Sequence, residues 1–197
     1  MAVKIFKRKL DIENVSGEML RYLNFSGRDT NGFNPNHHMS FDIEFNEDDA
    51  RALYDLGWRI KVKGLIPGTQ ERARNARFDD ELDNKTYHAT VNVSFDYPCY
   101  VYRIIEGTNT MVRLRPDSPN SLRNIAVLDS DSIVKADLTI RGSYTKKDGL
   151  ISLYLEDGKF HVSSGRLQDK YAGFVVDDDE PDLVDQEYDG DAPWENK

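Results

Sequence analysis

Residues 134–155 read VKADLTIRGSYTKKDGLISLYL, and this stretch decides the class of fold. Apolar and polar side chains alternate on both sides of Asp148-Gly149. A period of two is typical of a β-strand that buries one face. An Asp-Gly pair between two such runs is a strong signal for a tight turn. The stretch therefore predicts two antiparallel strands joined as a hairpin.

The same alternation recurs in both directions from this hairpin. Residues 58–63 and 87–95 each carry apolar side chains at every second position, and residues 100–105 and 111–114 are further strand candidates. Asp157-Gly158 predicts a second turn. Many short strands with few helices are typical of an antiparallel β barrel or sandwich. We therefore predict a mainly β fold.

One clear helix interrupts the strands. Asn46 caps it, and the acids at 47–49 suit the positive end of a helix. Gly57 ends it. A second short helical piece is predicted between residues 118 and 128.

Two stretches are interpreted as long loops, residues 26–38 and residues 66–85. In the second, the cations Arg72, Arg74 and Arg77 precede a run of acids. Loops of this length are usually functional or disordered. Two interpretations stay open for it: a flexible arm that closes over a bound strand, or a solvated loop whose charges compensate one another.

The charge is concentrated at one end of the chain. The 197 residues have a net charge of −9, and residues 177–197 contain ten acids and one lysine. Residues 1–176 are therefore balanced, and we predict one folded domain there. The low apolar content of residues 177–197 predicts a disordered acidic tail.

Several classes of protein are disfavoured. No apolar run approaches the ~18 residues of a membrane-spanning helix, and no secretory signal is recognised. The single Cys99 excludes an internal disulfide and a Cys-rich zinc site. The histidines lack metal-ligand spacing, and neither a phosphate loop nor a nucleophile–base pair is found. We expect a soluble, non-catalytic, cytoplasmic protein without metal or cofactor.

Cationic and aromatic side chains are the most informative feature. Arg59, Lys61 and Lys63 share one face of a predicted strand, which is either a track for phosphates or an ordinary solvated face. Tyr100 and Tyr102 also share a face, which is either a stacking platform for bases or part of the core. The candidate nucleic-acid-binding residues are Arg59, Lys61, Lys63, Arg72, Arg74, Arg77, Tyr97, Tyr100, Tyr102, Arg103, Arg141, Tyr144, Lys146, Lys147 and Tyr154.

The acidic tail has two interpretations, a solubility tail or a short partner-binding motif. A tail that only confers solubility has little need of Trp194, whereas acids attract a basic partner and an aromatic ring fills a pocket. A tethered anionic tail also competes with phosphate for a cationic groove. The candidate partner-binding residues are Asp177, Asp178, Asp179, Glu180, Asp189, Asp191 and Trp194.

Several of these stretches together resemble a known family, the bacteriophage single-stranded DNA-binding proteins with an OB-fold core. The resembling stretches are NEDDA at 46–50, GWRIK at 57–61, VNVSF at 91–95 up to Pro98, LDSDSIVKADL at 128–138, Tyr144, and 149–155. The resemblance implies a five-stranded barrel with a basic, aromatic-lined groove. It also implies a tail that restrains DNA binding and recruits replication or recombination proteins. Residues 191–194 resemble the acidic-Pro-aromatic endings of this family, although three residues follow the aromatic.

Our leading hypothesis is a sequence-nonspecific single-stranded DNA-binding protein that protects DNA during phage replication and recombination, in the host cytoplasm. The alternative is a structural or adaptor β-domain of a phage. An inhibitor that mimics DNA is disfavoured by the balanced charge of residues 1–176. The preference for DNA or RNA and the oligomeric state are left open.

Overall fold

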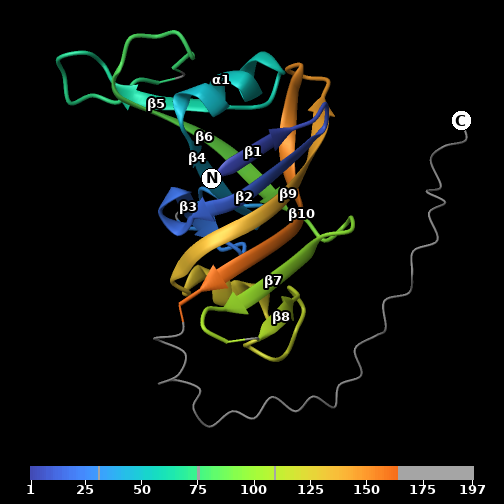
Figure 1. Cartoon of the computed structure of the whole chain (residues 1–197). Helices are drawn as coiled ribbons and strands as arrows, with labels where there is room; N and C mark the ends of the chain where they lie inside the picture. Colours follow the sequence, from blue (N-terminus) through green and yellow to red (C-terminus); the bar gives the residue numbers. More distant parts are fainter. Residues whose placement is uncertain (31, 75, 109, 164–197) are drawn as a thin grey trace, which may run out of the picture. The chain divides into compact units, whose positions relative to one another are not determined.

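The computed structural model describes residues 1–30, 32–74, 76–108 and 110–163. It divides the chain into two units, Met1–Ser164 and Gly165–Lys197. The fold described below is that of the first unit (Figure 1). The predicted tail, residues 177–197, lies outside the described residues.

Strands dominate the first unit, so the mainly β prediction is confirmed. The elements in chain order are β1 (Ala2–Ile5), β2 (Lys9–Ser16), the 3₁₀ helix η1 (Gly17–Met19), β3 (Leu20–Asn24), β4 (Met39–Phe45), α1 (Glu47–Asp55), β5 (Lys61–Leu65), β6 (Asp83–Val93), β7 (Tyr100–Ile105), β8 (Met111–Leu114), the 3₁₀ helix η2 (Ile125–Asp129), β9 (Ile133–Thr145) and β10 (Leu150–Val162). Asn46 caps α1 as predicted, its side chain accepting the amide of Asp49 at 2.8 Å. No helix among the described residues is long and apolar enough to cross a membrane.

All ten strands belong to one sheet, whose longest members are β9 and β10. The main order is β1-β2-β9-β10-β6-β4-β3, with β5 beside β6, β7 beside β10 and β8 beside β7. In Figure 1, β9 and β10 run through the middle of the unit, with α1 and β5 towards one end and β7 and β8 towards the other. The hairpin predicted at Asp148-Gly149 is confirmed, because it joins β9 to β10.

The sheet differs from the predicted antiparallel barrel, because it is mixed and its path ends at β1 and β3 within the described residues. One edge of β10 pairs with two successive segments. Leu153 and Tyr154 lie beside β6 in parallel, and residues 157–162 lie beside β7 in parallel. β6 ends at Val93, and the chain returns to the same edge of β10 where β7 begins, at Tyr100. Parallel pairing requires a long return connection, and β8, η2 and β9 supply it.

A β-bulge explains why the second predicted turn is wrong. Asp157-Gly158 lies inside β10, where the register with β9 shifts between Leu155 and Asp157. A bulge adds a residue to one strand and bends it without ending it. The glycine is required by packing, because a Cβ at Gly158 would lie 2.8 Å from the Phe160 ring.

The core lies on one face of the sheet, and α1 contributes two buried side chains to it. Trp58 is fully buried, and Phe25, Phe41 and Phe160 form a cluster with ring centroids 5.3–5.8 Å apart. Such ring pairs contribute about 0.5–1.5 kcal/mol each beyond their buried area. Gly142 provides the space for Trp58, because a Cβ there would lie 3.0 Å from the indole ring.

Residues 66–85 have more structure than the predicted loop. The backbone of Leu65 forms a bridge with Arg72, and the amide of Ala73 donates to the carbonyl of Gly64 at 3.0 Å. Phe78 is buried against Tyr87, with ring centroids 4.7 Å apart. The run of acids in this segment ends at Asp83, where β6 begins. This segment is therefore a packed excursion between β5 and β6.

Arg103 lies in the interior, which corrects its assignment as a DNA-binding residue. Its side chain is 2% exposed, and it donates to both carboxylate oxygens of Asp131, at 2.7 and 3.0 Å. A buried guanidinium needs such a partner, because an unpaired charge in the interior is strongly destabilising. Arg103 therefore fastens β7 to the segment that precedes β9.

We predict that Arg103→Met destabilises the fold by about 3–5 kcal/mol, because it leaves the Asp131 carboxylate without its buried partner. Unfolding in urea, followed by circular dichroism, measures the change. The double variant Arg103→Met/Asp131→Leu should lose less, since no charge is stranded. A single variant within about 1 kcal/mol of the parent would contradict this role.

Candidate nucleic-acid interface

The sheet has one face turned away from the core. On β6, Tyr87, Ala89, Val91 and Val93 are buried towards the core, so residues 86, 88, 90 and 92 point the opposite way. The register carries this alternation to the neighbouring strands. Asn92 lies opposite Tyr154, and Tyr154 lies opposite Arg141.

The same face continues in both directions. Lys61 lies opposite His88, and its Nζ lies 2.6 Å from the Thr90 hydroxyl. Tyr100 lies opposite Asp157, on the far side of the bulge. We call this side of the sheet the outer face. Its cations and rings come from segments far apart in the sequence: Lys61, Tyr100, Arg113, Arg141 and Tyr154.

The centre of the outer face is an arginine between two tyrosines. The Arg141 guanidinium carbon lies 4.5 Å from the ring centroid of Tyr97 and 5.3 Å from that of Tyr154. Tyr97 is 60% exposed, because it stands in the excursion between β6 and β7. Within the described part of the chain, no carboxylate forms an ion pair with Arg141. The site therefore presents an uncompensated cation held against aromatic rings.

A second pair of the same kind lies towards the β8 edge. The Arg113 guanidinium carbon is 4.8 Å from the ring centroid of Tyr100, and both residues are exposed. Val101 and Arg103 are buried, so alternation places Tyr100 and Tyr102 outside the core. Of the two interpretations of these tyrosines, the surface position is the correct one. Arginine and tyrosine in such pairs offer charge and a flat surface together.

The predicted row of cations on strand β5 and just before it exists, but part of its charge is compensated. Arg59 forms an ion pair with Asp148 in the β9–β10 turn. The Nζ of Lys63 lies 3.6 Å from the buried carboxylate of Asp42. Lys61 is exposed and contacts only a hydroxyl among the residues that the structure describes. Lys61 is therefore the member of the row best placed for a phosphate.

The hairpin between β9 and β10 carries four of the predicted residues, Tyr144, Lys146, Lys147 and Tyr154. Tyr144 lies opposite Ile151, whereas Tyr154 lies opposite Arg141. Alternation places Tyr144 on the side of Gly142 and Trp58, away from the outer face, although it is exposed at the hairpin end. Tyr144 and Tyr154 therefore lie on opposite faces of the hairpin. Lys146 and Lys147 are exposed at the tip.

The three arginines of the 66–85 segment are exposed, but only Arg72 is brought to a defined position, near Lys63. The segment's acids have partners of their own, because Asp79 forms an ion pair with Arg51 of α1. This partner lies outside the segment, so the contact supports neither the flexible-arm nor the self-compensated interpretation.

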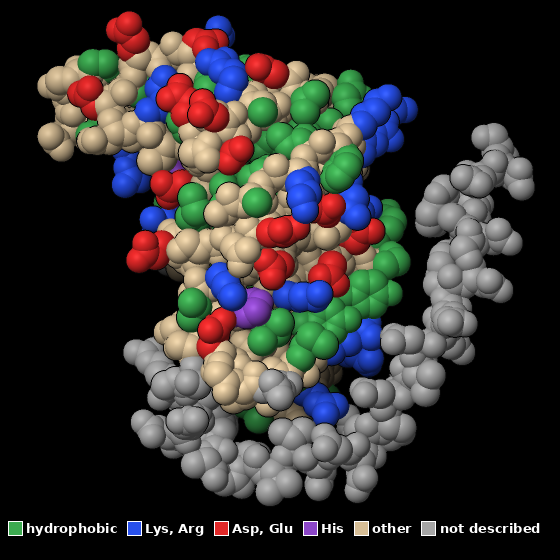
Figure 2. Space-filling model, viewed as in Figure 1, with side chains coloured by type: hydrophobic (Ala, Val, Ile, Leu, Met, Phe, Trp, Pro, Cys, Tyr) green, Lys and Arg blue, Asp and Glu red, His purple; other side chains and the backbone are tan. Residues whose placement is uncertain are grey.

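Acidic side chains lie between the cations on the sheet surface. Asp11 accepts a hydrogen bond from Thr139 at 2.9 Å, and Asp137 accepts one from the amide of Asn14 at 2.7 Å. Burial raises the pKa of Asp157 above its usual range. On the view in Figure 2, Lys and Arg side chains lie among acids and hydrophobic atoms. Phosphate contacts on such a surface are confined to particular positions.

Two residues were missed by the sequence analysis. Arg113 stands on the outer face because β8 pairs with β7, and Tyr22 stands beside Lys63 with a centroid distance of 4.4 Å to its Nζ. Arg113 could have been found, because residues 111–114 were recognised as a strand candidate. Nothing in the sequence linked Tyr22 to Lys63. The tail residues Asp177, Asp178, Asp179, Glu180, Asp189, Asp191 and Trp194 lie outside the described residues. No group of three or more metal-ligating side chains occurs in the ranges that are described.

Cys99 lies in the segment between β6 and β7 that also carries Tyr97. The reactivity of its thiol reports how closely this segment is packed. The residue is buried, and burial raises the pKa of its thiol to about 12. At pH 8 the thiol is therefore protonated and covered, and we predict that an aromatic disulfide reagent does not label the native chain. In urea the pKa returns to about 8.5 and labelling is fast. Rapid labelling of the native chain would contradict the packing.

Comparison with known protein families assigns the chain to one of them. The sequence profile of the family described as "Putative phage ssDNA-binding domain" matches residues 2–197. No curated protein and no solved structure shows a significant match. The profile spans almost the whole sequence, including all ten strands of the sheet. The chain belongs to the family of phage single-stranded DNA-binding domains.

Proposed function

We propose that the chain binds single-stranded DNA on the outer face, without sequence preference and without catalysis. The observation that carries this proposal is the Tyr97–Arg141–Tyr154 arrangement. Its guanidinium is free to neutralise a phosphate, and its rings are available to bases. The family membership supports DNA as the ligand.

The chemistry of these side chains predicts binding without sequence preference. Every base has a π-face, so stacking on tyrosine tolerates any sequence and contributes about 1–3 kcal/mol per base. Phosphate contacts carry no sequence information. A strand bound in this way leaves room for replication or recombination proteins to follow, and we propose that protection of single strands in those processes is its role in the phage.

The acidic residues 177–197 fit this role as a competitor for the outer face. Ten acids tethered to the same chain have a high effective concentration near any cationic surface. Because both interactions are electrostatic, salt screens the tail and the phosphates together. We propose that DNA displaces the tail, which then becomes available to partner proteins through its acids and Trp194.

The central prediction concerns Arg141 and Tyr154. Arg141→Gln and Tyr154→Leu should each weaken binding of a labelled oligo-dT about 10-fold, because each removes a stacking or phosphate contact. Fluorescence anisotropy at low salt measures Kd.

Two variants on α1, which packs on the core side of the sheet, serve as controls. Arg51→Gln and Tyr54→Leu remove a cation and a ring of the same kinds. They should change Kd less than two-fold. Equal losses in both pairs of variants would show that general charge and stability, rather than the outer face, control the binding.

The role of the tail predicts a dependence on salt. A chain ending at Val176 should bind oligo-dT more tightly than the full chain at low salt, and the difference should shrink as salt rises. With three or four phosphates neutralised, log Kobs should fall with log salt with a slope of about −2 to −3. Identical affinities of the two chains at low salt would exclude competition by the tail.

A further inference from the structure

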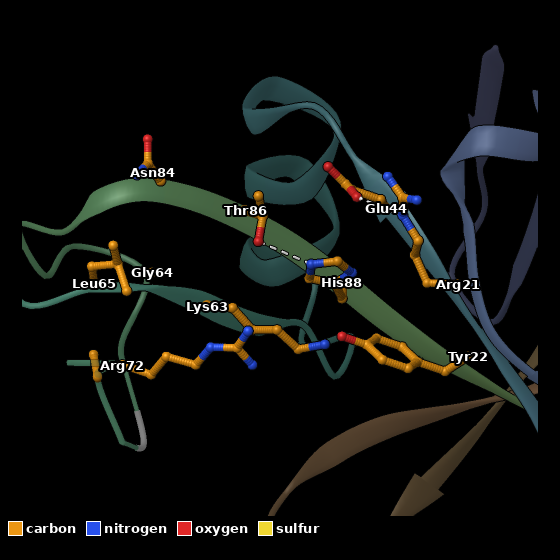
Figure 3. Close-up of a pocket in the computed structure, with 11 residues that line it drawn as sticks. Arg21, Tyr22, Glu44, Lys63, Gly64, Leu65, Arg72, Asn84, Thr86 and His88 are labelled. Atoms are coloured by element: carbon orange, nitrogen blue, oxygen red, sulfur yellow. Dashed lines mark hydrogen bonds and ion pairs between the residues drawn. The ribbon is translucent and has the colours of Figure 1, made fainter. Parts of the chain in front are cut away.

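A pocket of about 360 Å³ opens where β3, β4, β5 and β6 meet (Figure 3). Its volume lies at the lower end of the range for small-ligand sites. Arg21, Tyr22, Glu44, Lys63, Arg72 and His88 are the side chains that give it its chemistry. None of them belongs to the Tyr97–Arg141–Tyr154 arrangement.

Two irregularities in the strands build the pocket. The β3–β4 register shifts after Arg21, and Tyr22 has a positive φ of 52°. This conformation is rare for a bulky residue. The β5–β6 register shifts around Gly64, where a Cβ would lie 2.8 Å from that of Leu82. Bulges that re-aim side chains, and strained residues, are concentrated at binding sites.

The bulge turns the Tyr22 ring out of the sheet. Tyr22 is 67% exposed, and the Lys63 ammonium lies 4.4 Å from its ring centroid. In Figure 3 the Lys63 and Arg72 side chains extend across the pocket towards Tyr22. The ring is therefore a platform with a cation beside it, and most of its surface is open to a ligand.

The pocket is cationic in spite of its one carboxylate. Arg21 pairs with Glu44 at 3.3 Å, whereas Arg72 and Lys63, the latter shared with Asp42 at 3.6 Å, face an incoming anion. Arg72 has no ion-pair partner in the described ranges. His88 is buried among the lining residues, and burial together with the nearby Lys63 lowers its pKa. The attraction for an anion therefore rests on Lys63 and Arg72.

The backbone holds Arg72 at the rim of the pocket. The backbone of Arg72 forms a β-bridge with Leu65. The amide of Ala73 donates to the carbonyl of Gly64 at 3.0 Å, and the amide of Ile66 donates to the carbonyl of Glu71 at 2.9 Å. The neighbouring Arg74 does not line the pocket. Arg74 is exposed and provides a matched control in the same segment.

We propose that this pocket seats one nucleotide of the bound strand, with its base on the Tyr22 ring and its phosphate between Lys63 and Arg72. The inference rests on the proposed function, because the strand must first lie on the outer face. Lys61 and Lys63 are two residues apart on the same face of β5, so the strand passes from one to the other without crossing the sheet.

Photo-crosslinking of the full chain to oligo-dT containing 5-iodouracil tests the proposal, with adducts located by mass spectrometry. We expect adducts on Tyr22 in addition to those on Tyr97 or Tyr154. Adducts on Tyr97 or Tyr154 with none on Tyr22 would overturn the pocket and leave the proposed function intact. An oligonucleotide that does not bind at all would overturn both.

Affinity measurements on variants provide the second test. Tyr22→Asn removes the ring with a residue that tolerates positive φ, and Tyr22→Phe retains the ring. We expect Tyr22→Asn and Arg72→Gln to weaken oligo-dT binding at least five-fold. Tyr22→Phe and Arg74→Gln should stay within two-fold of the parent. Equal affinities for Arg72→Gln and Arg74→Gln, or an unchanged Tyr22→Asn, would overturn the proposal.

Discussion

The pairing of β10 along both of its edges is the constraint on which the rest of the structure depends. One edge is held by β9 over nearly its whole length, and the other is shared by β6 and then β7. Because side chains alternate across a strand, burying Leu153, Leu155 and Phe160 forces Tyr154 to the opposite face. The bulge after Leu155 shifts this alternation by one residue, so that Gly158 and Phe160, rather than Asp157, are buried in the segment beside β7.

The outer face follows from this arrangement. Since β6 and β7 occupy successive parts of one edge, the chain between them is excluded from the sheet and carries Tyr97 over Arg141. The second pair, Tyr100 and Arg113, comes from the strands that follow. Cations backed by rings bind phosphate and base with the same side chains, which explains how a unit whose acids and bases balance can hold a polyanion.

The sequence predicted what depends on local pattern. Alternation located β5, β6, β9 and β10, Asp148-Gly149 located the turn between β9 and β10, and the common face of Lys61 and Lys63 was predicted correctly. Arg103 could not be recognised as buried, because its partner Asp131 lies 28 positions away. The parallel pairs of β10 and the positive φ of Tyr22 likewise depend on contacts between distant segments. Alternation along the sequence determines which side chains share a face of a strand. Pairing between distant segments determines which of these faces lie side by side.

Ring resonances of selectively labelled tyrosine, recorded by NMR as oligo-dT is added, show directly whether bases stack on the outer face. Stacked bases shift the resonances of the ring that they cover. We expect large upfield shifts for Tyr97 and Tyr154 and an unchanged Tyr54, whose ring packs on Phe78 on the core side. Saturable binding with Tyr97 and Tyr154 unshifted would contradict the account and place the DNA elsewhere.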